Sequence, residues 1–502
     1  MFYRKRIPAK TTRNYKISLS SFATRPNADV DENLMSTNRA KIYYNYDVKN
    51  GALKTGIGFE DLTLPNSQNI EDGERQILLP ENINFNGVWH FKYYSQTNNQ
   101  KDHFLIYYGT DNNLYWCKLV SLFPQSFLMS EDVQYPTRPN ALQYRLNGED
   151  VMMFTENTSD MMVWKPEYSA YIVGNAPKVV SMCLHYERLF AIVEGERIQL
   201  RFSDDLDPTN WENSPTEGGY IELVDERGPM SKVVSFEDYL YVFRDFGISR
   251  VSAFGDQAEF SVSGVHTSSG KIYGGSVAVC GNKIVYLSKN GLHYFDGVSS
   301  EKLDLNIDSL FDGVTNDNAC SAFLDNKYYL ACRLNFQDQE RVGCENYSGG
   351  YTNNAIIELD LIDGTINIVR GVDVVSMTSI EEGNISKLIC CFGGEYGGRL
   401  GQLTHSGEMF GTPLKKVWKS PKSDMGYCDK LKVVKKISLM TKHEIVVKIS
   451  TEKESKSFKM SGANSPQTIR PNMVGKLIEI SIESNLPLCD VSKPEIIVGV
   501  VG

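Results

Sequence analysis

Residues 230–254, MSKVVSFEDYLYVFRDFGISRVSAF, show a pattern that recurs along most of the chain. An alternating strand is followed by a polar turn, an apolar strand, a glycine turn and a third strand. Short alternating strands that meet at polar or glycine turns are typical of antiparallel meanders. Six further segments repeat the pattern: 87–119, 139–166, 179–204, 274–297, 319–364 and 373–404. Their spacing, roughly 40–55 residues, is typical of β-propeller blades.

The repeat predicts an all-β fold whose main part is a β-propeller of about six to seven blades. A closed ring of meanders lets each blade bury its two faces against its neighbours. The composition agrees, because 27 Tyr and 23 Phe suit pleated, half-buried surfaces, and helical periodicity extends over no useful length. The alternative is two or three unrelated antiparallel domains that share similar hairpins.

Two regions lie outside the repeat. Residues 1–85 are predicted to form an N-terminal arm with lead-in strands before a propeller over 86–404, and residues 405–429 are predicted to be a linker. A new alternation of five short strands then predicts a small C-terminal β-sandwich over 430–502.

Charge limits the classes of partner. The chain has 52 Lys and Arg against 62 Asp and Glu, a net charge of −10, which argues against a general nucleic-acid binder. This net charge is compatible with a channel wall along which nucleic acid passes without binding. Local positive charge occurs in residues 4–16 and at Lys430–Lys436, where a solvated tail and a solvated strand face are the favoured interpretation.

The cysteines and the N-terminus bear on the compartment. Ten Cys are scattered without CxxC spacing, which predicts small buried residues in a reducing environment. Residues 1–20 lack an apolar signal core, and no run of about 18 apolar residues occurs. We therefore expect neither a cleaved export signal nor a membrane span.

The acidic loop RFSDDLDPTNWENS, residues 201–214, is the densest group of candidate ligands. An EF-hand counted from Asp205 would need glycine at its sixth position and glutamate at its twelfth, where this chain has Asn210 and Thr216. Calcium is therefore disfavoured, and whether the loop binds a cation stays open. The favoured interpretation is a connector between consecutive blades, in which the carboxylates cap turn N–H groups and Trp211 packs on an apolar face.

The same loop also approximates a sialidase-type Asp box, with one residue inserted before the tryptophan. Such boxes are structural turns. Glycosidic chemistry would need two carboxylates about 5–10 Å apart, for which the chain offers Asp204, Asp205, Asp238, Asp245 and Asp296.

Other chemistry-bearing motifs are missing from the sequence. The histidines, at positions 90, 103, 185, 266, 293, 405 and 443, form no HxH or HExxH pair, and no GxSxG or P-loop occurs. The Gly-rich run at 393–402 and the aromatic strands at 239–243 and 327–332 are interpreted as a turn and as blade cores. We therefore predict no enzyme, and we name no catalytic, cofactor-binding or metal-ligating residue and no cofactor.

Several phrases resemble structural proteins of tailed bacteriophages. They are YYNYDVKNGALKTGIGFEDL (43–62), SDDLDPTNW (203–211), DYLYVFRDFGISRV (238–251), SSGKIYGGSVAVCGN (268–282) and NGLHYFDG (290–297). The likeness covers residues 40–300. Among phage structural proteins, the chain resembles the propeller-bearing nozzle or tail-hub proteins of short-tailed phages.

The resemblance implies a structural virion protein of the tail, assembled in the host cytoplasm. It implies a homo-oligomeric ring of six copies below the portal and adaptor, which anchors fibres or spikes. Genome DNA would pass through that ring without sequence-specific binding. Two alternatives stay open: a receptor-binding or glycan-degrading tail protein, and a cellular β-propeller that acts as an interaction scaffold.

Overall fold

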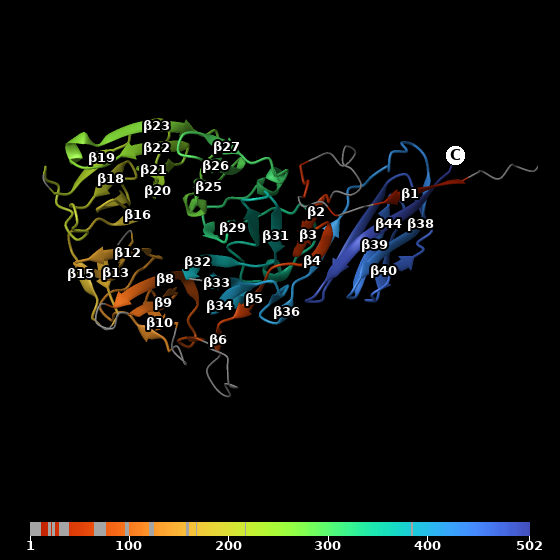
Figure 1. The fold of residues 1–502 in the computed structure, drawn as a ribbon, viewed down its shortest axis with the longest axis horizontal. Coiled ribbons are helices and arrows are strands. Elements are labelled where there is room, and N and C mark those ends of the chain that lie inside the picture. The colour runs from red at the N-terminus through yellow and green to blue at the C-terminus, as the bar shows by residue number, and fades with distance from the viewer. Residues whose placement is uncertain are drawn as a thin grey trace, which may run out of the picture.

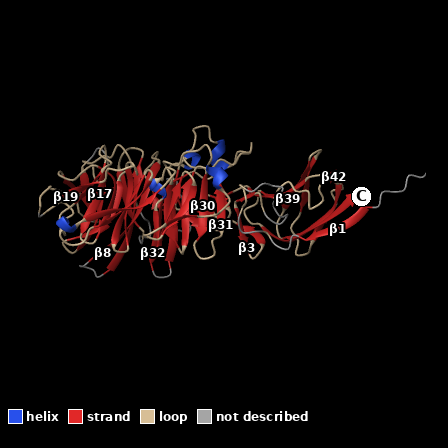
Figure 2. Cartoon of the chain, turned by 90° about the horizontal axis from the view of Figure 1, so that it is seen from above, coloured by secondary structure: helices blue, strands red, loops and turns tan. Residues whose placement is uncertain are grey.

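The computed structural model describes residues 12–18, 22, 26–29, 40–64, 77–95, 100–119, 125–156, 160–166, 168–215, 217–382 and 385–501. Within these ranges, seven antiparallel sheets form a ring, and a two-sheet sandwich lies beside the ring along the long axis (Figures 1 and 2). The predicted all-β fold is confirmed, and the propeller has seven blades.

Blades 1 to 6 are four-stranded meanders whose strands pair in sequence order. Blade 1 comprises β8 (Phe85–Ser95), β9 (Gln100–Gly109), β10 (Leu114–Lys118) and β11 (Phe127–Leu128). Blade 2 comprises β12 (Asn140–Leu146), β13 (Glu149–Thr155), β14 (Met161–Trp164) and β15 (Tyr171–Val173). Blade 3 comprises β16 (Val179–His185), β17 (Arg188–Val193), β18 (Gln199–Phe202) and β19 (Gly219–Glu222).

The next three blades continue this order. Blade 4 comprises β20 (Met230–Phe236), β21 (Tyr239–Arg244), β22 (Gly247–Ser252) and β23 (Ser261–Thr267). Blade 5 comprises β24 (Ala278–Cys280), β25 (Lys283–Ser288), β26 (Gly291–Phe295) and β27 (Ser300–Lys302). Blade 6 comprises β28 (Cys320–Leu324), β29 (Lys327–Cys332), β30 (Ala355–Asp360) and β31 (Ile366–Arg370).

Blade 7 is closed by a strand from the other end of the chain. It contains β32 (Val374–Glu382), β33 (Ile385–Phe392) and β34 (Leu400–Thr404), and its fourth strand is β5 (Gly58–Asp61), which pairs antiparallel with β34. The short strands β35 (Glu408–Met409) and β36 (Thr412–Pro413) extend this sheet. Hydrogen bonds between residues more than 300 positions apart therefore hold the ring shut.

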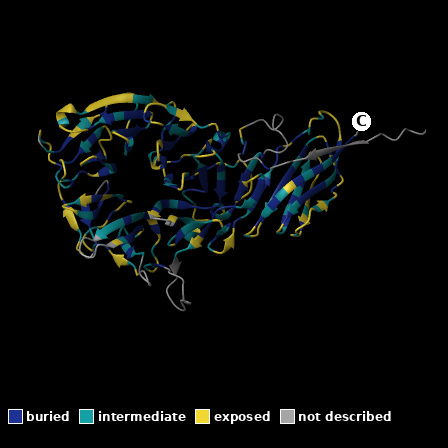
Figure 3. Ribbon diagram, viewed as in Figure 1, coloured by how far each residue is buried: buried dark blue, intermediate teal, exposed yellow. Residues whose placement is uncertain are grey.

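Apolar side chains fill the spaces between neighbouring blades. Between blades 1 and 2, for example, Ile106 and Phe104 lie in one buried cluster with Phe154 and Trp164. The outermost strands are more exposed than the inner ones, as at β23 (Figure 3). This layering explains why the second strand of a blade, such as β21 or β25, is a nearly continuous run of buried residues, whereas the outer strand β23 has none.

The sandwich draws strands from both ends of the chain. One sheet holds β3 (Tyr46–Lys49), β4 (Ala52–Thr55), β44 (Asp490–Val501), β38 (Lys432–Thr441) and β41 (Gln467–Ile469), joined by β1 (Thr12–Ser18) and β42 (Met473–Gly475). The facing sheet is β2 (Ile42–Tyr44), β37 (Lys416–Lys419), β43 (Ile478–Ser484), β39 (Ile445–Thr451) and β40 (Ser455–Met460).

The strand distribution differs from the predicted segment boundaries. Strands β1 to β4, predicted within an arm over 1–85, are sandwich strands, and β5 is a blade strand. The predicted linker 405–429 contains β35, β36 and β37, which all pair in sheets. The reason is that an isolated five-stranded unit at 430–502 would leave sheet edges uncovered, whereas the N-terminal strands add to them.

The remaining elements are short. Strands β6 (Thr63–Leu64) and β7 (Ile77–Leu78) form a small parallel pair. Five 3₁₀ turns complete the described part of the chain: η2 (Gln257–Glu259), η3 (Gly274–Ser276), η4 (Asp308–Phe311), η5 (Gly343–Asn346) and η6 (Gly394–Tyr396).

A buried polar junction fastens the sandwich to blade 6. Asn45, at φ 61°, accepts a hydrogen bond from the backbone N–H of Arg370 at 2.8 Å and donates to the carbonyls of Arg370 and Lys415 at 3.1 and 2.7 Å. The Arg370 guanidinium forms ion pairs with Asp338 at 2.7 Å and Glu345 at 2.9 Å. It also lies 4.0 Å from the ring centroid of Phe336 and 5.0 Å from that of Tyr44. The junction therefore joins β2 and β3 to blade 6 through satisfied polar groups.

Candidate functional site: the axial cavity

A cavity with a volume of about 750 Å³ lies on the propeller axis. Its walls come from the innermost strands β8, β12, β16, β20 and β32 and from the segments that enter blades 5 and 6. This volume lies within the range of small-molecule sites, about 300–1,000 Å³. The propeller therefore places side chains from all seven blades around one space.

Two glycines let the segment that enters blade 5 approach its neighbours. A Cβ atom at Gly274 would lie 2.9 Å from the carbonyl oxygen of Ser231, and one at Gly275 would lie 2.1 Å from that of Ala319. These glycines belong to the phrase SSGKIYGG, so part of its distinctive composition has a packing reason. Both contacts are with the backbone of neighbouring blades, which lets this segment line the axis.

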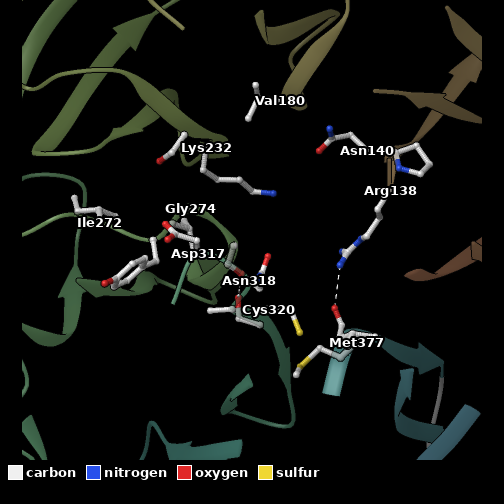
Figure 4. A pocket seen from close by; sticks show the side chains of 18 of the residues that line it. Arg138, Asn140, Val180, Lys232, Ile272, Gly274, Asp317, Asn318, Cys320 and Met377 are labelled. Atoms are coloured by element: carbon white, nitrogen blue, oxygen red, sulfur yellow. Dashed lines mark hydrogen bonds between the residues drawn. The ribbon is translucent and has the colours of Figure 1, made fainter. Parts of the chain in front are cut away.

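Four cations and two carboxylates line the cavity. Lys271 forms an ion pair with Asp317 at 2.6 Å, and Arg197 pairs with Glu194 at 3.4 Å. Asp245 is the other lining carboxylate. Arg138 and Lys232, which point into the cavity from blades 2 and 4 (Figure 4), complete the set.

Arg138 and Lys232 differ from the other two cations in their partners. One N–H of Arg138 donates to the carbonyl of Val375 at 3.1 Å, and its guanidinium lies 5.8 Å from the Trp89 ring centroid. Burial, and then the positive charge of Arg138, lower the pKa of Lys232. The two cations therefore act on one another across the cavity.

The sequence predicted that the acidic loop 201–214 connects two consecutive blades, and this prediction is wrong. It joins β18 to β19, the third and fourth strands of blade 3. The prediction failed because it ended blade 3 at Asp204 and omitted the short fourth strand. The local chemistry is as expected: Asp207 accepts from the N–H of Thr209 at 2.9 Å and from its hydroxyl at 2.6 Å.

Trp211 folds back into the protein, as the sequence predicted. Its side chain is 1% exposed, and its indole N–H donates to the carbonyl of Pro208 at 2.9 Å. The ring packs in the cluster between blades 2 and 3, with Tyr144 and Leu189. Within the described ranges, no three His, Cys, Asp or Glu side chains gather as a metal site would require.

The candidate carboxylates are dispersed. Asp204 accepts from the N–H of Asp205 at 2.7 Å. Asp238 lies in the turn between β20 and β21 and accepts a long hydrogen bond from Tyr186 at 3.4 Å. Asp296 accepts N–H groups in the turn after β26, and these hydrogen bonds lower its pKa. Of the five, Asp245 alone lines the axial cavity.

The histidines and the remaining motifs have structural surroundings. His293 stacks on Tyr286 with ring centroids 5.0 Å apart, and it shares a hydrogen bond of 3.0 Å with Ser288, as a blade-face residue would. The run 393–402 joins β33 to β34 through η6. The aromatic strands lie in blade cores, as predicted, with Tyr241, Phe243 and Tyr328 buried. Eight of the ten cysteines are buried, and Cys428 is exposed.

His185 provides a pH-dependent contact between blades 3 and 4. It is 2% exposed and shares a hydrogen bond of 2.8 Å with Ser235 of β20, and burial lowers its pKa to about 4. The unfolded chain protonates this imidazole near pH 6.5, whereas the folded chain does so only near pH 4. The stabilising contribution of the neutral imidazole is therefore fully present above pH 6.5 and is lost as the pH falls to about 4. We expect His185→Asn to reduce the loss of unfolding free energy between pH 7 and 4 by about 2–3 kcal/mol, measured by urea denaturation.

Ser235→Ala is the matched control for this prediction. It removes the hydrogen bond but keeps the titrating group, so it should lower stability by about 1 kcal/mol at every pH and keep the slope. If the unfolding free energy of His185→Asn fell between pH 7 and 4 as much as that of the wild type, the assignment of this pH dependence to His185 would be wrong.

No family model and no curated protein matches the chain. Solved structures to which it is similar include Raptor from Chaetomium thermophilum, at 8% identity and a TM-score of 0.43, over 70% of this chain and 29% of that one. PorZ of the type-IX secretion system of Porphyromonas gingivalis is similar at 10% identity and 0.42, over 75% and 45%. The RRP9 WD40 repeats are similar at 8% identity and 0.40, over 67% and 96%.

The chain thus spans less than half of the length of Raptor and of PorZ. No helix in the described ranges is long and apolar enough to cross a membrane. The strands and their pairing define the class of the protein: a seven-bladed β-propeller with an interlocked β-sandwich.

Proposed function

We propose that this protein is a structural subunit of a bacteriophage tail, which associates head to tail into a homo-oligomeric nozzle or hub ring of six copies. The observation that carries the proposal is a separation of charge between the two ends of the molecule. The phage-like phrases in the sequence support the virion role.

The basic end is the sandwich. Residues 430–502 contain twelve Lys and Arg against seven Asp and Glu, although acidic residues outnumber basic ones in the whole chain. Exposed lysines lie at the sheet edge formed by β40: Lys453 is in the turn before this strand, and Lys456 and Lys459 are on it. Lys456 pairs with Glu454 at 2.8 Å and Lys459 with Glu444 at 2.7 Å. Lysines on an edge strand discourage pairing with another strand, and they also offer a cationic surface.

The acidic end lies on blades 3 and 4. Residues 194–238 contain twelve Asp and Glu against four Lys and Arg, and Glu212, Glu222 and Glu226 are exposed. Strands β18 and β19 lie at the end of the long axis opposite the sandwich (Figure 1). Each copy therefore carries complementary charge at its two ends.

Complementary ends favour a heterologous contact. Such contacts form closed rings when the rotation between copies closes, and opposite charge steers the encounter. The axial cavity has the volume of a small-molecule site, so a DNA path would run between copies and not along the propeller axis. In the proposed ring the portal and adaptor lie above, and fibres or spikes attach at the side.

A cellular propeller that acts as an interaction scaffold is the second candidate. Exposed aromatic residues on blades 3 and 4 favour it, since Tyr186 and Phe254 pack edge to face at 5.1 Å while 47% and 69% exposed. Aromatic residues of this kind are enriched at protein interfaces. Such a scaffold would be monomeric when purified.

Charge reversal tests the head-to-tail contact. We expect Lys453→Glu, Lys456→Glu and Lys459→Glu together to abolish the oligomer in sedimentation velocity at about 0.1 M salt, where the Debye length is about 10 Å. Glu212→Lys, Glu222→Lys and Glu226→Lys together should do the same.

The control is a chain with all six reversals, which restores complementarity and should recover the oligomer. A monomeric wild type would contradict the proposal, as would oligomers that are unaffected by either set of reversals.

A further inference from the structure

The axial cavity contains an uncompensated pair of cations. Lys232 projects from β20 of blade 4, and Arg138 projects from the segment before β12 of blade 2, so that the two charged groups approach from different walls (Figure 4). Among the residues that the structure describes, no hydrogen-bond or ion-pair acceptor meets the Lys232 amine. Arg138 uses one N–H on the carbonyl of Val375, which leaves the rest of its fork for other acceptors.

Among the described residues, neither lining carboxylate pairs with Arg138 or Lys232. Asp317 pairs with Lys271 at 2.6 Å. This contact, with a smaller contribution from Asp245, raises the pKa of Lys271. Burial and the charge of Arg138 lower the pKa of Lys232, and no carboxylate opposes them. Arg138 and Lys232 therefore have no carboxylate partner within the described part of the cavity, although Asp245 also lines it.

We propose that the axial cavity binds a small phosphate-bearing anion between Arg138 and Lys232. Two cations on different walls suit a tetrahedral oxyanion, which presents oxygens in several directions, better than a planar carboxylate. Arginine offers a fork of N–H donors and lysine a point charge, and both are common phosphate ligands. The side chain of Asn318, also at the cavity, is an additional donor, and Asn140, whose amide donates to the carbonyl of Val179 at 3.4 Å, has a second N–H.

The size of the cavity agrees with a small ligand. About 750 Å³ exceeds what inorganic phosphate needs and would hold a phosphomonoester or a pyrophosphate group. The site does not depend on oligomerisation, because all of its walls come from one propeller.

Calorimetric titration of the full chain with inorganic phosphate and with pyrophosphate, at constant ionic strength, tests the proposal. We expect saturable binding of one anion per chain, with pyrophosphate the tighter ligand. Lys232→Met and Arg138→Met should each weaken the binding about tenfold or more, the effect of losing one charge-assisted contact. Arg138→Lys should retain part of the affinity.

Lys289→Met is the matched control, because Lys289 is exposed in the turn between β25 and β26 and lies outside the cavity lining. It should bind as the wild type does. Circular dichroism identifies any variant that fails to fold. If a methionine variant fails to fold, Arg138→Lys, which keeps the positive charge, still tests the contribution of the guanidinium group.

Three results would overturn the proposal. One is the lack of saturable binding of either anion up to about 10 mM. Another is equal affinity in wild type, Lys232→Met and Arg138→Met. The third is binding of a single-stranded oligonucleotide, or of an acidic peptide, that depends on Arg138 and Lys232 and exceeds that of pyrophosphate, which would make the site a macromolecular contact.

Discussion

Arg370→Met is expected to lower the free energy of unfolding by about 3–5 kcal/mol, the range for breaking a buried ion pair. The Arg370 side chain is 2% exposed, and its partner Glu345 is 8% exposed. Removing the guanidinium leaves the Glu345 carboxylate buried without its cation. It also removes the contacts with Phe336 and Tyr44 that hold the sandwich against blade 6. Urea denaturation followed by tryptophan fluorescence measures the effect.

Arg399→Met is the control for this change. Arg399 also pairs with a carboxylate, Asp61 at 3.3 Å, but its side chain is 47% exposed. Exposed ion pairs contribute about 0–1 kcal/mol, so the control should remain close to wild type. Similar losses in the two variants would show that burial at the junction has no special role.

Phe59→Ala is expected to open the ring at blade 7 and to lower the free energy of unfolding by about 3–5 kcal/mol. Phe59 is 1% exposed on β5 and packs edge to face on Phe392, with centroids 5.0 Å apart. Because β5 supplies the fourth strand of blade 7, its loss also exposes the N–H and C=O groups of β34. Hydrogen exchange in residues 400–404 should therefore increase more than in blade 3.

Glu60→Ala is the control on the same strand. Its side chain is exposed, and surface substitutions of this kind change stability by less than about 0.5 kcal/mol. If Phe59→Ala lost less than about 1 kcal/mol and exchange at β34 stayed slow, the closing role of β5 would be wrong.

The blades were predictable because short turns join their strands, so that paired strands are neighbours in the sequence. At blade 5, the turns GNK and KNG flank β25, whose residues Ile284 and Tyr286 are buried, so three strands are visible within 24 residues of sequence. The fourth strands were missed because they are short or exposed. Strand β23 has no buried residue, and β27 has three residues.

Pairings between the two ends of the chain were not predictable. Strand β5 reads as one more hairpin strand, and nothing near Gly58 indicates that its partner lies at Thr404. The same holds for β1, which pairs with β44 at the far end of the chain. Local patterns predict strands, whereas closure of the ring depends on contacts that only the folded chain brings together.

The cavity residues were missed for a similar reason. Arg138 lies in a loop before β12 and Lys232 lies within an alternating strand, so neither belongs to a motif. They become a pair only because the ring places blade 2 and blade 4 around one axis. Cation pairs of this kind would be detectable from sequence only by assigning the inner strand of every blade.

Negative-stain electron microscopy of the purified full chain tests the central proposal most directly. A head-to-tail hub subunit should form closed six-fold rings at about 0.1 M salt, with the sandwich of each copy against blades 3 and 4 of the next. These rings should dissociate near 1 M salt, where the Debye length is about 3 Å. Monomers at both salt concentrations, or rings built from sandwich-to-sandwich contacts, would contradict it.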